Sequence, residues 1–77
     1  MELTVKFTWY DDEKVWISSW SDERIGLALD SNSFDGLLEK VKIILYDVIE
    51  QDLGYKGEVK LKVETSRVVS MNVGEQT

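Results

Sequence analysis

The sequence of 77 residues contains no cysteine, no histidine and no proline. Without cysteine, the chain can form no disulfide, no thiolate metal site and no cysteine nucleophile. Without histidine, it lacks the side chain that most often acts as a general acid or base and as a metal ligand. These absences predict a protein that is not an enzyme and that binds no cofactor and no metal.

Long hydrophobic runs are also missing. No apolar stretch approaches the roughly 20 residues that a membrane-spanning helix requires. The first residues, Met1-Glu2-Leu3, lack the basic start and the apolar stretch of a secretory signal. We therefore expect a cytoplasmic protein with no membrane partner.

The composition that remains is that of a soluble globular domain, with 43% apolar and 31% charged residues. The formal net charge of −6 disfavours binding to a phosphate backbone. The bases are nevertheless concentrated near the end of the chain, at Lys56, Lys60, Lys62 and Arg67. This strip makes a nucleic-acid-associated protein the alternative functional hypothesis. Solvated strand positions are the favoured interpretation of the same residues.

Strand patterns occupy both ends of the sequence. Apolar side chains alternate with polar ones over residues 2–10, and the alternation returns over residues 58–65. The acidic turn Asp11-Asp12-Glu13 separates the first strand from a second over residues 15–20, and its adjacent carboxylates fan outward, so they predict no metal site. A third, shorter strand is expected over residues 24–30.

The middle of the sequence predicts a helix over about residues 33–53. Apolar residues recur there at spacings of three and four, which is the pattern of a helix with one buried face. Ser33 is placed to cap the first turn, and Asp35 suits the positive end of the helix dipole. Gly54 follows the last apolar position and is expected to end the helix.

The order of these elements predicts one α+β domain over residues 1–77. A right-handed crossover through the helix brings the last strand beside the first. The result is a β-β-β-α-β fold with a four-stranded mixed sheet in the order 3-2-1-4 and one helix on one face. Residues 66–77 form a tail whose apolar residues show no clear period. The sheet face without a helix is where we expect function.

The register of the first two strands decides where the tryptophans lie. Pairing Val15 opposite Trp9 gives an internally consistent core and places Trp16 and Trp20 on the uncovered face. A slip of one residue would place both tryptophans inside. The first register is favoured, and exposed tryptophans are typical of binding hot spots. The predicted protein interface therefore comprises Trp16, Trp20, Thr4, Thr8 and Lys6.

Unprotected strand edges give a second reason to expect association. An open edge can pair with a strand from another copy. The apolar tail Val68–Val73 could add a strand at such an edge. A homodimer is the expected state.

Several segments resemble a known family. They are Leu3-Thr4-Val5-Lys6-Phe7-Thr8-Trp9, Val15-Trp16-Ile17, Ile25-Gly26-Leu27 and Ser33-Phe34-Asp35-Gly36-Leu37-Leu38. Over residues 3–65 the chain resembles the N-terminal domain of HicB-like antitoxins, in particular a small branch with a Val-Trp signature in strand two. The resemblance implies a non-enzymatic, antitoxin-type protein-binding module. It also implies a small basic mRNA-cleaving toxin as partner, which the acidic surface would suit.

The chain departs from this family in three respects. Ile25 stands where the family usually has a proline before the glycine, and Gly36 stands where it usually has an acid, so the capping box is incomplete. HicB-like antitoxins usually also carry a C-terminal helix-turn-helix or ribbon–helix–helix module. The residues after the fourth strand are too few for one, so we expect no specific DNA binding.

Overall fold

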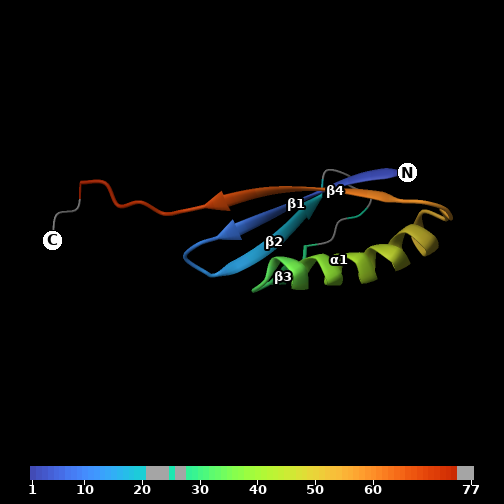
Figure 1. The fold of residues 1–77 in the computed structure, drawn as a ribbon, viewed down its shortest axis with the longest axis horizontal. Coiled ribbons are helices and arrows are strands. Elements are labelled where there is room, and N and C mark those ends of the chain that lie inside the picture. The colour runs from blue at the N-terminus through green and yellow to red at the C-terminus, as the bar shows by residue number, and fades with distance from the viewer. Residues whose placement is uncertain (21–24, 26–27, 75–77) are drawn as a thin grey trace.

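The computed structural model describes residues 1–20, 25 and 28–74. The strands are β1 (Glu2–Tyr10), β2 (Val15–Trp20), β3 (Asp30–Ser31) and β4 (Lys60–Val68). The helix α1 (Phe34–Asp47) continues into a π-helical segment, η1 (Val48–Asp52). These elements confirm the predicted α+β fold, a four-stranded mixed sheet in the order β3-β2-β1-β4 with α1 against one face (Figure 1).

β1 is the central strand that joins the two halves of the sheet. It pairs antiparallel with β2 and parallel with β4, and the parallel pairing runs over all nine of its residues. Of the expected third strand over residues 24–30, residues 24, 26 and 27 lie outside the described residues. Among the rest only Asp30 belongs to a strand, because β3 pairs just Asp30 and Ser31 with β2. The fourth strand extends beyond the predicted end at residue 65 to Val68.

The helix forms where its capping and apolar pattern predicted. Ser33 has an extended backbone, and its hydroxyl accepts a hydrogen bond from the Gly36 N–H at 3.0 Å. The helical segment ends through the π-type bond from Leu53 N–H to the Val48 carbonyl, at 3.2 Å, and Gly54 follows with a φ of 63°. A glycine, which has no Cβ, adopts this left-handed backbone at little steric cost, so the chain can reverse there.

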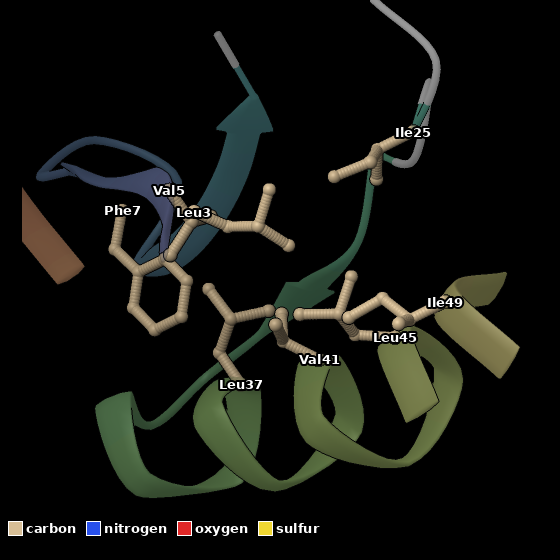
Figure 2. Packing of buried hydrophobic residues seen from close by; sticks show 8 residues of the cluster. All are labelled: Leu3, Val5, Phe7, Ile25, Leu37, Val41, Leu45 and Ile49. Carbon is tan, nitrogen blue, oxygen red and sulfur yellow. The ribbon is translucent and has the colours of Figure 1, made fainter. Parts of the chain in front are cut away.

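The core lies between α1 and the sheet. One helical stripe with four-residue spacing points toward the side chains of β1, and Ile25 closes the core at one end (Figure 2). The buried residues are Leu3, Val5, Phe7, Ile25, Leu37, Val41, Leu45 and Ile49. The buried stripe of α1 therefore packs on its own sheet.

The predicted register of the hairpin is wrong by one residue. The structure pairs Trp9 with Trp16 and Val5 with Trp20, so both tryptophans of β2 lie on the helix side of the sheet. The Trp16 ring packs against Phe34 at the start of α1, with centroids 5.4 Å apart in an edge-to-face geometry. Large aromatic side chains bury more apolar surface under the helix than valine or isoleucine would. The predicted patch of exposed tryptophans does not exist.

The molecule is elongated, with Cα extents of 58 × 20 × 17 Å. Its radius of gyration of 15.5 Å exceeds the roughly 11–12 Å of a compact domain of this length. Figure 1 shows the reason, because the segment after β4 extends past the hairpin and away from α1. None of the described helices is long and apolar enough to span a membrane.

Candidate protein-binding site

One side of β4 has unused backbone hydrogen-bonding groups. The Lys60 N–H donates to the Met1 carbonyl at 2.9 Å, and the Val68 carbonyl accepts from the Asp11 N–H at 3.0 Å. Alternate residues of a parallel strand bond to the same neighbour, so the even-numbered residues of β4 bond to β1. The odd-numbered residues 61–67 direct their N–H and C=O groups to the other side. The described part of the chain contributes no strand there.

The two faces of β4 differ in chemistry. Leu61 and Val63 are half-buried on the helix side, because they lie beside Leu3 and Val5 of β1. The uncovered side carries Lys60, Lys62, Glu64 and Ser66. An incoming strand would therefore meet an apolar row on one face and both signs of charge on the other.

A groove opens between the C-terminal half of α1 and the start of β4. Its volume is about 710 Å³. The lining combines apolar residues with a charged rim, and consists of Lys42, Leu45, Tyr46, Ile49, Glu50, Tyr55, Lys56, Gly57, Val59 and Leu61. Tyr55 fixes one wall, because its hydroxyl donates to the Glu58 carbonyl at 2.9 Å and its N–H donates to the Ile49 carbonyl at 3.1 Å. The groove is a preformed, largely apolar recess beside the free edge.

A tail follows β4 at the opposite end from the groove. Because β4 extends to Val68, the name tail is used from here on for the shorter segment of residues 69–74, which continue in the direction of the strand (Figure 1). Val69, Met71 and Val73 are 55%, 81% and 85% exposed. The intervening Ser70 and Asn72 are polar, so the sequence continues the odd-numbered apolar pattern of Leu61 and Val63. This alternation is not evident from the sequence, because the adjacent pair Val68-Val69 interrupts the period of two.

Ionisable groups mark the two ends of β4. Near its end, hydrogen bonds from the Arg67 guanidinium at 2.6 Å and the Trp9 indole at 3.1 Å lower the pKa of Asp11. At the groove, a hydrogen bond to the Glu50 carboxylate and its negative charge raise the pKa of Tyr46. Both shifts come from neighbouring side chains at the surface.

The structure divides the predicted interface between two faces. Thr4, Lys6 and Thr8 lie on the uncovered side of β1, where the Thr8 hydroxyl is 2.9 Å from the Ser66 hydroxyl. Trp16 and Trp20 lie on the helix side. The five residues therefore do not form one surface.

The basic strip is also divided. Lys60 and Lys62 project from the uncovered face, whereas Arg67 lies on the helix side and is bound to Asp11. Lys56 belongs to the groove wall. A phosphate backbone requires bases that converge on one face, and these four do not. Among the described residues, no three carboxylates lie close enough together to hold a metal ion.

Fold and surface together define a small α+β domain, in which the described residues form one helical segment and pair no strand with the outer edge of β4. The chain belongs to the family described as "Domain of unknown function (DUF1902)", whose family model matches residues 2–74. The comparison with curated proteins found no match, and the comparison with solved structures found none either.

Proposed function

We propose that this chain is a non-enzymatic protein-binding module of the HicB-antitoxin type that self-associates through the free edge of β4. The observation that carries the proposal is the nine-residue edge strand with its outward N–H and C=O groups. Edge strands bind other strands through such groups, and side chains on the two faces then select the partner. A second copy offers the same edge, and two-fold homodimers are the commonest symmetric assemblies.

Self-association is tested by sedimentation equilibrium of the wild-type chain against Val63→Pro and Val63→Thr. The Val63 N–H points to the free edge, so proline removes an intermolecular donor without removing a bond to β1. Threonine keeps the N–H and the β-branched shape. We expect dimers for the wild type and for Val63→Thr, and monomers for Val63→Pro. A monomeric wild type at all concentrations, or a dimeric and folded Val63→Pro, would refute the edge as the interface.

The solvent face of the helical segment supports a basic partner of the toxin type. Its exposed acids are Asp35, Glu39, Asp47, Glu50 and Asp52. The two bases on the same segment are engaged, since Lys40 Nζ donates to the Asp30 carbonyl at 2.9 Å and Lys42 lies 3.5 Å from Glu39. Such a surface favours a positively charged partner and would speed its encounter.

The proposed basic partner is tested with the product of an adjacent gene. The proposal expects an adjacent gene for a small basic protein that co-purifies with this chain after co-expression, in a salt-dependent manner. The double variant Asp47→Asn/Asp52→Asn should weaken co-purification, whereas Glu13→Gln in the hairpin turn should leave it unchanged. The role of the exposed acids would be contradicted if the basic protein encoded next to this gene did not co-purify with the chain, or if it bound both variants equally well.

A further inference from the structure

We propose that two copies pair β4 antiparallel about a two-fold axis at Val63 and that each copy places its tail in the groove of the other. The inference rests on the proposed self-association and adds to it the register and a reciprocal docking site. The occupant of the groove is thus a defined segment, residues 69–73 of the second copy.

Backbone geometry limits the possible registers. In an antiparallel pair, residues that point their N–H and C=O groups at the partner stand opposite one another. The outward groups of β4 belong to odd-numbered residues, so odd residues must meet odd residues. A symmetric pair must then be centred on one residue and not between two.

Charge selects among these centres. A centre at Val63 sets Lys62 opposite the partner's Glu64, and symmetry repeats this favourable pair. A centre at Lys62 or Glu64 sets a charge against its own copy. A centre at Leu61 sets Lys60 against Lys62, and a centre at Thr65 matches no opposite charges. Val63 is the centre that pairs opposite charges without opposing like ones.

The same register suits the helix side of β4. Val63 meets the partner's Val63, and Leu61 meets the partner's Thr65, so half-buried apolar side chains gain cover. Side chains on opposed strands share a face, so both helices lie on one side of a continuous sheet. That sheet has the order β3-β2-β1-β4 followed by its symmetric copy.

Continuing the register brings the tail to the groove. Residue 67 stands opposite the partner's residue 59, and residue 69 opposite its residue 57. Val59 and Gly57 line the groove. Extended as a strand in the pair, the exposed Val69, Met71 and Val73 would continue the odd-numbered row and turn their side chains toward the partner's helix and its apolar lining.

A chain cannot fill its own groove in the same way. The groove begins beside Val59 and the tail begins at Val69. Ten residues of extended strand span about 33 Å, at about 3.3 Å per residue. The tail also points away from its own groove, as Figure 1 shows by the course of the chain after β4. In the proposed pair, the tail reaches the partner's groove by continuing in the direction of its own β4.

The register is tested by a charge exchange. Lys62→Glu and Glu64→Lys should each raise the dimer dissociation constant about 10-fold, because each turns two attractive cross-strand pairs into repulsive ones. An equimolar mixture should recover near wild-type affinity as a heterodimer, since the two variants complement each other. Lys60→Glu is the matched control and should stay within about 3-fold, because it faces the partner's Ser66 in this register. A mixture as weak as its components, unaffected single variants, or a damaging Lys60→Glu would overturn the register.

Tail docking is tested by paramagnetic broadening between chains. The sequence has no cysteine, so a nitroxide on Met71→Cys labels one position only. The spin-labelled chain, with nitrogen at natural abundance, is mixed with ¹⁵N-labelled wild type. The nitroxide should then broaden the groove amides of Leu45, Ile49 and Val59 in the ¹⁵N chain. The same label in a Val63→Pro background should broaden none of them.

The outcomes separate this inference from the proposed function. A dimer whose groove amides stay sharp would overturn tail docking while self-association stands. Broadening only when spin label and ¹⁵N share a chain would also overturn it, since the tail would then occupy its own groove. A chain that is monomeric at every concentration would refute both proposals.

Discussion

Ser18 shows how one residue of β2 holds the backbone at Leu29. Ser18 is only 2% exposed, its Oγ accepts from the Leu29 N–H at 3.0 Å, and its own N–H donates to the Leu29 carbonyl at 2.9 Å. Ser18→Ala would leave the Leu29 N–H without this partner and should lower the free energy of unfolding by about 1–3 kcal/mol. Urea denaturation measures the change. The control Ser19→Ala, exposed on the other face, should stay within about 0.5 kcal/mol. Equal effects of the two would contradict this role.

Asp11 gives a prediction about pH at the residue scale. Hydrogen bonds from Arg67 and then from Trp9 hold its pKa below the usual value. A carboxylate whose pKa is lower in the folded state adds stability above its unfolded pKa of about 3.9. That contribution is lost as the pH falls through the lowered value. Arg67→Gln should raise the pKa of Asp11 in an NMR titration and reduce the acid-induced loss of stability. Lys62→Gln should do neither, and an unchanged pKa in Arg67→Gln would contradict the assignment.

At the scale of elements, the hairpin and the start of α1 are joined by aromatic rings. Trp16 contacts Phe34, and its centroid is 5.4 Å from that of Trp9. Trp16→Thr should therefore lower the free energy of unfolding by about 2 kcal/mol, which is less than for a fully buried tryptophan. Ile17→Thr, on the uncovered face, should lower it by less than about 1 kcal/mol. Thermal or urea denaturation measures both losses. A larger loss of stability for Ile17→Thr than for Trp16→Thr would favour the register that pairs Val15 with Trp9.

The elements themselves could be predicted from sequence because their periods are clear. The alternation of β1 and the apolar stripe of α1 each admit one assignment. The register of β2 could not be predicted in the same way, since Val15, Trp16 and Ile17 are consecutive apolar residues that suit either face. The packing of Phe34 decides it, and that contact joins residues far apart in the sequence. The groove likewise depends on how the end of α1 lies beside β4.

At the scale of the whole molecule, three features lie along one strand. The groove opens at the start of β4. No strand of the described residues pairs with the outer edge of β4, and the apolar tail leaves its end (Figure 1). The charges on the edge are self-complementary about Val63. A monomer would leave Val69, Met71 and Val73 in water, whereas a symmetric pair uses all three features at once.

Amide hydrogen exchange along β4 tests self-association most directly, because alternate residues report on the two sides of the strand. The N–H groups of Lys62 and Glu64 bond to β1 in the monomer and should be protected at every protein concentration. Those of Val63 and Thr65 point to the free edge and should be protected only in the dimer. The account predicts that Val63 and Thr65 lose protection on dilution while Lys62 and Glu64 keep it. Rapid exchange of Val63 and Thr65 at concentrations well above any dissociation constant, with Lys62 and Glu64 protected, would show that the edge is unpaired and would contradict the account.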